Sequence, residues 1–144
     1  MKVINHVKML LPAIKGNDAF ARAAVAAFCS SLSPSLEEIN DIKTSVSEAV
    51  TNVIVHAYPE EIGEIEIDVT IYQTGLLEIV IQDNGIGVGN LDQAKRPFFT
   101  TKSTEEHSGM GFTIMEAFMD ELEVATEIGR GTRVTLRKKI KEHA

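Results

Sequence analysis

The chain has little cysteine, no long apolar run and no excess of positive charge. Its one cysteine, Cys29, excludes an internal disulfide, and its apolar neighbours predict a small buried side chain rather than a reactive thiol. No hydrophobic stretch reaches the length of a membrane span, and the brief apolar patch before Pro12 predicts no secretory signal. The net charge of −7 disfavours direct binding to nucleic acid, so any phosphate site must supply its own local positive charge.

The length and composition are those of a globular protein with one core. We expect residues 1–144 to form a single domain that buries roughly two thirds of its unfolded surface and needs no metal or disulfide to fold. The 44% hydrophobic and 24% charged fractions are typical of a soluble protein, which we expect in the cytoplasm. No internal repeat or interdomain linker is visible.

The first half of the chain predicts a strand and two helices. Alternating apolar residues before Lys15 indicate a first strand, and a short amphipathic helix should start at Asn17 or Asp18. Ser35 and Glu38 have the spacing of a capping box that opens a second helix, running to about residue 56. The predicted apolar stripe of the first helix is Phe20, Ala23, Ala24, Ala27 and Phe28, with Leu32 as a further candidate, and that of the second is Ile39, Ile42, Val46, Ala49, Val50, Val53 and Ile54.

The second half predicts two β-hairpins separated by a loop and a helix. Residues 65–71 and 77–81 alternate around a turn at 74–75, which predicts an antiparallel pair with one wet face. A helix is expected over residues 111–119, and strands over 122–128 and 132–136 around a glycine turn. The basic residues from 133 to 141 are expected on an edge strand and tail.

Two glycine pairs are candidates for a nucleotide site. Asp83 ends an apolar run and is followed by Gly85 and Gly87, although Asp-Asn-Gly is also an ordinary turn sequence. Gly109 and Gly111 stand where a helix begins, and helix N-termini favour bound phosphate. Two such loops in one small chain suggest a nucleotide.

Glu48 and Asn52 lie four residues apart on the side of the second helix away from its apolar stripe. They could act on one ligand, or they could be two polar residues on a wet helix face.

Residues 89–108 lack an apolar period, and a stretch of about twenty residues without an obvious helix or strand is too long for a mere connector in a compact domain. The run from Pro97 to Lys102 combines aromatic residues, hydroxyls and a lysine, as expected of a lid over a polyphosphate. A loop pinned by two core phenylalanines is the alternative, and both descriptions can hold together.

These motifs, in this order, resemble the ATP-binding boxes of the superfamily that contains gyrase, histidine kinases and the heat-shock chaperone ATPases. Within it, residues 47–52, 99–102 and 108–116 look like those of the anti-sigma-factor serine kinases of endospore-forming bacteria. The resemblance covers residues 17–136. It implies an α/β (α+β) two-layer sandwich with a mixed, largely antiparallel sheet, helices on one face and ATP held between helices and lid. It also implies a homodimer that inhibits a sporulation sigma factor in an ATP-dependent manner and phosphorylates a serine of an anti-anti-sigma protein.

The resemblance assigns roles that the residue types can perform. Glu48 is the expected general base, and Asn52 offers an oxygen to Mg²⁺. Asp83 is expected to accept a hydrogen bond from the adenine amino group. The other expected ATP/ADP contacts are Gly85, Gly87 and Thr132 near the base, and Thr101, Lys102, Gly109, Met110 and Gly111 near the phosphates.

Partner contacts are expected at Arg22 and Thr51, and at His107, which replaces an arginine of related kinases. The simplest interpretation of Arg22 is a solvated surface residue, although an exposed arginine beside an apolar stripe is also typical of a protein contact. Histidine cannot bind a phosphate bidentately and is mostly neutral at pH 7, so contact with the terminal phosphate should be weaker or come from Lys102 or a partner. An ATP-regulated binding protein without kinase activity, a histidine kinase catalytic domain and an inactive structural domain are the alternatives.

Overall fold

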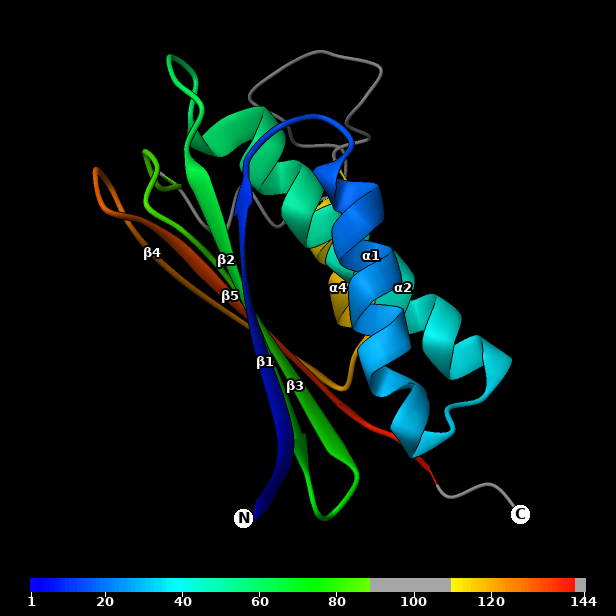
Figure 1. The fold of residues 1–144 in the computed structure, drawn as a ribbon. Coiled ribbons are helices and arrows are strands. Elements are labelled where there is room, and N and C mark those ends of the chain that lie inside the picture. The colour runs from blue at the N-terminus through cyan, green and yellow to red at the C-terminus, as the bar shows by residue number, and fades with distance from the viewer. Residues whose placement is uncertain (89–109, 142–144) are drawn as a thin grey trace.

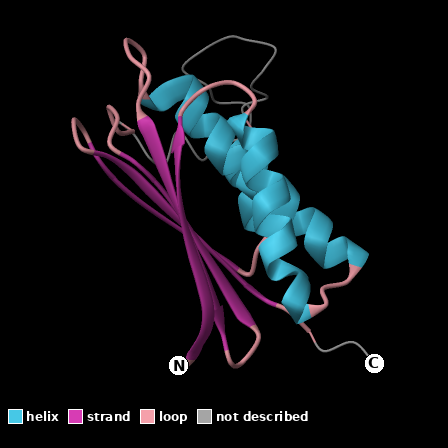
Figure 2. Ribbon diagram, viewed as in Figure 1, coloured by secondary structure: helices cyan, strands magenta, loops and turns pink. Residues whose placement is uncertain are grey.

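The computed structural model describes residues 1–88 and 110–141, which form one sheet with helices packed on one of its faces (Figures 1 and 2). The sheet has five strands in the order β1-β2-β3-β5-β4, and every pair of neighbours is antiparallel. This confirms the expected two-layer sandwich. The strands are β1 (Val3–Pro12), β2 (Glu64–Tyr72), β3 (Leu76–Asp83), β4 (Glu121–Glu127) and β5 (Gly131–Lys139). The helical segments are α1 (Asn17–Cys29), the 3₁₀ turn η1 (Ser30–Leu32), α2 (Leu36–Asn52), the π-helical turn η2 (Val53–Ala57) and α4 (Gly111–Phe118).

The core lies between the sheet and the helices, where the alternation of β2 and β3 directs one side chain in two. Ile65, Ile67 and Val69 of β2 are fully buried, as predicted from their period of two. Each such isoleucine or valine contributes roughly 1.5–3 kcal/mol relative to an exposed side chain. Helix α2 supplies the facing layer through Ile42, Val46, Ala49 and Val50. None of the helices in the described residues is long and apolar enough to cross a membrane.

The buried face of α1 differs from the predicted stripe. Ala21, Val25 and Cys29 have no exposed surface, whereas Phe20 is 55% exposed and Ala23 and Ala27 face solvent. The prediction holds for Phe28 and Leu32, which are partly buried against the core. It was wrong for Phe20, Ala23 and Ala27, because it centred the stripe on the large phenylalanines. Helix α1 packs on α2. The axes of packed helices generally lie about 8–10 Å apart, and small side chains at the contact allow the helices to approach closely. The expectation that Cys29 is a small buried residue is confirmed.

The capping box at the start of α2 is confirmed. The Ser35 hydroxyl accepts a hydrogen bond from the Glu38 N–H at 3.1 Å, and Glu38 Oε1 accepts one from the Ser35 N–H at 2.9 Å. Glu38 Oε2 also accepts from the N–H of Lys141 at 3.0 Å. The cap therefore also holds the chain beyond β5 against the helix layer.

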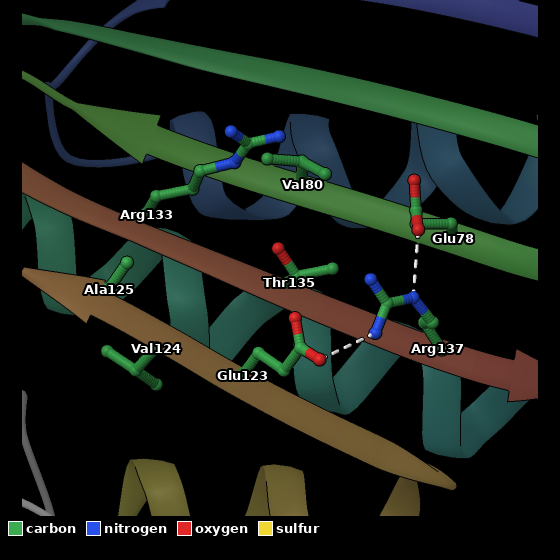
Figure 3. Close-up of a pocket in the computed structure, with 8 residues that line it drawn as sticks. All are labelled: Glu78, Val80, Glu123, Val124, Ala125, Arg133, Thr135 and Arg137. Atoms are coloured by element: carbon green, nitrogen blue, oxygen red, sulfur yellow. Dashed lines mark hydrogen bonds and ion pairs between the residues drawn. The ribbon is translucent and has the colours of Figure 1, made fainter.

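The expectation that the basic end forms an edge strand is wrong, because β5 lies between β3 and β4. On the sheet face away from the helices, Arg137 of β5 forms ion pairs with Glu78 at 2.8 Å and Glu123 at 3.1 Å (Figure 3). It forms a third with Glu121 at 3.0 Å. The positive charge of Arg137 is therefore neutralised by carboxylates on the two neighbouring strands rather than only solvated by water. The stems of such long side chains can cover apolar surface, and Val80 on the same face is only 7% exposed.

Candidate functional site

Asp83 ends β3 as a buried carboxylate with only 6% of its surface exposed. Its Oδ1 accepts hydrogen bonds from the backbone N–H of Gly85 at 2.9 Å and of Thr132 at 3.3 Å. Burial raises the pKa of Asp83, and the two N–H donors oppose that rise only in part. Both donors bind Oδ1, so Oδ2 has no hydrogen-bond donor among residues 1–88 and 110–141. Asp83 can therefore accept a further donor from a ligand.

The two positions after Asp83 that hold glycine, 85 and 87, require it for a packing reason that the sequence did not reveal. A Cβ on Gly85 would lie 2.1 Å from the carbonyl oxygen of Ala57, and one on Gly87, where φ is 78°, would lie 2.5 Å from that of Glu127. Real Cβ atoms do not approach so closely, so both positions need glycine for the chain to pack on itself. Their predicted contact with a nucleobase stays a prediction.

A threonine in β4 that the sequence reasoning missed completes this end of the site. Thr126 Oγ1 accepts from the Val88 N–H at 2.8 Å, donates to the Gly131 carbonyl at 3.2 Å and lies 3.0 Å from Thr132 Oγ1. The predicted site residue Thr132 is therefore held beside Asp83 by both its backbone and its hydroxyl. A threonine opposite another on the partner strand of a hairpin is the only signal that the sequence carried for this pair.

Glu48 and Asn52 come together against the first residue of α4. A Cβ on Gly111 would lie 3.3 Å from Glu48 Oε2, 3.1 Å from Asn52 Nδ2 and 3.3 Å from Asn52 Oδ1. Both side chains are half-buried, so they are less exposed than two polar residues on a wet helix face would be. Burial also raises the pKa of Glu48 above that of an ordinary glutamate.

The carboxamide oxygen of Asn52 is a buried acceptor without a hydrogen bond in the described part of the chain. Leaving such a group unpaired costs about 1–3 kcal/mol, which a ligand at this point would recover. Mg²⁺ prefers oxygen ligands, and Asn52 Oδ1 beside the Glu48 carboxylate fits that preference. The start of α4 has no side-chain cap, which is compatible with a ligand at this helix end.

The turn η2 joins the two groups of residues. It continues α2 directly after Asn52 and ends at Ala57, whose carbonyl accepts a hydrogen bond from the Ile86 N–H at 3.0 Å. Single π-helical turns occur frequently at functional sites. The structure thus brings Glu48, Asn52 and Gly111 into one group and Asp83, Gly85 and Thr132 into a second, one short turn away.

The remaining predicted site residues are not part of these groups. Arg22 lies exposed on α1, and Thr51 is half-buried on α2. Met110 directly precedes α4 and is its N-cap residue. Thr101, Lys102, His107 and Gly109, with the predicted lid over residues 89–108, lie outside the described residues.

A two-layer sandwich with these ATP-binding motifs is typical of one class of nucleotide-binding proteins. Comparison with known proteins supports the assignment of the chain to that class. The model of the histidine kinase-like ATPase domain family matches residues 12–138. In fold, the chain is similar to the crystal structure of the RsbU and RsbW domains of Rv1364c from Mycobacterium tuberculosis. The TM-score is 0.69 at 20% identity, over 94% of this chain and 32% of that one.

Closer relatives narrow the class. The chain is 47% identical to the anti-sigma F factor of Priestia megaterium, over 93% of this chain and 92% of the relative. It is 52% identical to the anti-sigma F factor of Clostridium beijerinckii, over 85% of this chain and 86% of the relative. The chain belongs to the anti-sigma F factor family of histidine kinase-like ATPases.

Proposed function

We propose that this protein is an ATP-dependent anti-sigma factor that is also a protein serine kinase. It binds a sporulation sigma factor and transfers the terminal phosphoryl group of ATP to a serine of an anti-anti-sigma protein. The observation that carries the kinase proposal is the contact of Glu48 and Asn52 with the first residue of α4. Membership of the anti-sigma F factor family supports the sigma-factor part.

Phosphoryl transfer depends on positioning and on neutralising charge, with one group to accept the hydroxyl proton. Glu48 is suited to that proton, because a carboxylate whose pKa is raised by burial is a stronger base than an exposed one. The serine Oγ bonds to the phosphorus, the bond from the phosphorus to the ADP oxygen breaks, and Glu48 takes the serine proton. Asn52 would hold Mg²⁺ through Oδ1, and the ion would supply positive charge beside the phosphates.

The base of the nucleotide belongs at Asp83 in this proposal. The Asp83 carboxylate accepts a hydrogen bond from the adenine amino group, with Thr132 as a second contact and Gly85 and Gly87 along the base. The phosphates lie toward Gly111, at the start of the helix that Gly109 and Met110 precede in the sequence. Thr101 and Lys102, which lie outside the described residues, are proposed as further polar contacts to the phosphates. This orientation places adenine and phosphates at opposite ends of η2.

Protein partners are proposed at surfaces outside the nucleotide site. The exposed position of Arg22 on α1 is compatible with contact to the anti-anti-sigma protein. Thr51 and His107 are proposed for the same kind of contact, and the working form of the protein is proposed to be a homodimer. Size-exclusion chromatography with light scattering would test the dimer directly.

Radiolabelled ATP tests the reaction. Incubation of the protein with labelled ATP, Mg²⁺ and the cognate anti-anti-sigma protein should label a serine of the latter, and Glu48→Gln should slow the labelling strongly. ATP binding without label transfer would support an ATP-regulated binding protein instead. Acid-labile phosphohistidine in the product would identify a histidine kinase domain. Absence of any thermal shift with Mg²⁺-ADP would contradict a nucleotide site altogether.

A further inference from the structure

Tyr58 immediately follows η2, and its hydroxyl joins three segments of the chain. The hydroxyl donates a hydrogen bond to the carbonyl oxygen of Glu64 at 2.7 Å. It also accepts one from the backbone N–H of Asn84 at 2.8 Å. Asn84 is the residue after Asp83. One side chain therefore connects the end of η2, the start of β2 and the end of β3, which all lie at the same end of the molecule (Figure 1).

The ring of Tyr58 is held in place by its surroundings. A Cβ on Gly63 would lie 2.1 Å from Tyr58 Cε1, so the ring occupies the space that a side chain at residue 63 would need. The preceding residue, Ala57, supports the same loop through its hydrogen bond from Ile86. Two consecutive residues at the end of η2 thus hold the loop after β3.

This support reaches Asp83 through its hydrogen-bond donors. Oδ1 of Asp83 depends on the N–H of Gly85, which is the residue directly after Asn84. If the Asn84 N–H loses the Tyr58 hydroxyl, the peptide units of residues 84 and 85 lose one of their anchors. The direction of the donor at Gly85, and with it the orientation of the carboxylate, is then free to change.

We propose that Tyr58 is a positioning residue that holds the Asp83 carboxylate in the orientation needed to recognise the amino group of adenine. This inference rests on the proposed nucleotide site. Tyr58 does not touch the base. Through η2 it also ties the adenine end of the site to Asn52 at the phosphate end, so that one short segment sets the spacing between them.

The test compares two nucleotides rather than one affinity. Titration calorimetry measures binding of ATP and of the triphosphate of purine riboside, which lacks the 6-amino group. Tyr58→Phe keeps the ring against Gly63 and removes only the hydroxyl. The only other tyrosine, Tyr72 at the end of β2, gives the matched control Tyr72→Phe, because no hydrogen bond of its hydroxyl occurs in the described structure.

The preference for ATP over the analogue should fall about tenfold in Tyr58→Phe and stay unchanged in Tyr72→Phe. A purely structural role would weaken both nucleotides equally and leave their ratio intact, and this result would overturn the proposal. Asp83→Asn separates the proposal from the site itself. If Asp83→Asn removes the preference and Tyr58→Phe does not, only the role of Tyr58 is wrong. If the unmodified protein shows no preference, the adenine site is wrong.

Two further measurements keep the proposal testable if Tyr58→Phe does not fold correctly. Gly63→Ala keeps the hydroxyl but displaces the ring, and it should lower the same ratio. In the unmodified protein, hydrogen exchange of the Asn84 amide should be slowed at least tenfold relative to an unprotected amide. A fully unprotected Asn84 amide would overturn the proposal without any substitution.

Discussion

The side chain of Asn52 lies against the backbone of Gly111, so close that a Cβ at residue 111 would stand 3.1 Å from Asn52 Nδ2 and 3.3 Å from Asn52 Oδ1. The two residues are 59 positions apart in the chain. This contact brings the carboxamide oxygen of Asn52, which is buried and has no hydrogen bond within the described residues, to the start of α4. A single methyl group at residue 111 would therefore press directly on the proposed phosphate end of the site.

Gly111→Ala should therefore separate binding from stability. Alanine is favoured over glycine in a helix by about 0.5–1 kcal/mol, which offsets part of the crowding, so the unfolding midpoint should change little. The added methyl group displaces Asn52 and Glu48, and affinity for Mg²⁺-ATP should fall about tenfold. Calorimetry with and without Mg²⁺ measures this, and the loss should be smaller without the ion. Equal affinity of both proteins for Mg²⁺-ATP would contradict the placement of the phosphates.

Glu48→Gln should lower the rate of phosphoryl transfer by about 10²–10⁴-fold, which is the usual contribution of a general base. The ATP-free protein should become slightly more stable at pH 7, because glutamine removes a carboxylate whose charged form is disfavoured by burial. Single-turnover kinetics and urea unfolding measure the two effects. Glu37→Gln, on the exposed first turn of the same helix, is the control and should leave the rate unchanged.

Asp83 should make the stability of the ATP-free protein depend on pH. Burial raises its pKa, so the folded chain keeps the Asp83 proton at pH values where the unfolded chain has lost it. The stabilising contribution is complete below the ordinary aspartate pKa of about 3.9 and is lost as the pH rises through the raised value.

Asp83→Asn stays neutral and should therefore gain stability relative to the unmodified protein as the pH increases from about 4 to 7. Urea unfolding at several pH values measures the difference between the two proteins. A difference that stays constant over this range would show that the Asp83 carboxylate titrates normally.

Arg137→Met should destabilise the fold by about 1 kcal/mol, more than the loss of an ordinary surface pair, because three carboxylates from β3 and β4 lose their common partner. The three carboxylates hold the pKa of Arg137 above its usual range, so its charge is present at any accessible pH. Arg130→Met is the control. Arg130 is 79% exposed and, among the described residues, forms one ion pair, with Glu127 at 3.4 Å, so its loss should change stability by less than about 0.5 kcal/mol. Equal effects of the two substitutions would contradict the network.

Local patterns were sufficient for much of the fold. The Ser35/Glu38 spacing located the start of α2, and the alternation of residues 65–71 and 77–81 predicted the β2–β3 hairpin and its buried face. These features depend on neighbours within a few residues. Predictions that depended on a distant partner were less accurate. The buried stripe of α1 is an example, because its small residues are explained only by packing against α2.

The residues of the candidate site divide in the same way into those that local motifs predicted and those that depend on distant contacts. Glu48, Asn52, Asp83 and Thr132 were predicted from motifs, and the structure places them in two neighbouring groups. Tyr58 and Thr126 were missed, because a tyrosine after a helix and a threonine in a strand are common and their partners are distant. Gly85 and Gly87 were expected beside the nucleobase, which stays a prediction, whereas the close approach that the structure shows is of the chain to itself.

The sequence by itself determined the type and period of each element and the helix cap, since these follow from spacing along the chain, and its resemblance to related ATPases identified the residues proposed for the chemistry. Only the tertiary structure decided which of them meet. The order β1-β2-β3-β5-β4 makes β5 an inner strand, brings Thr132 to Asp83 and directs Arg137 toward carboxylates on both neighbouring strands. Strand order and helix packing depend on how all the apolar faces are buried at once, and no short segment of the chain contains that information.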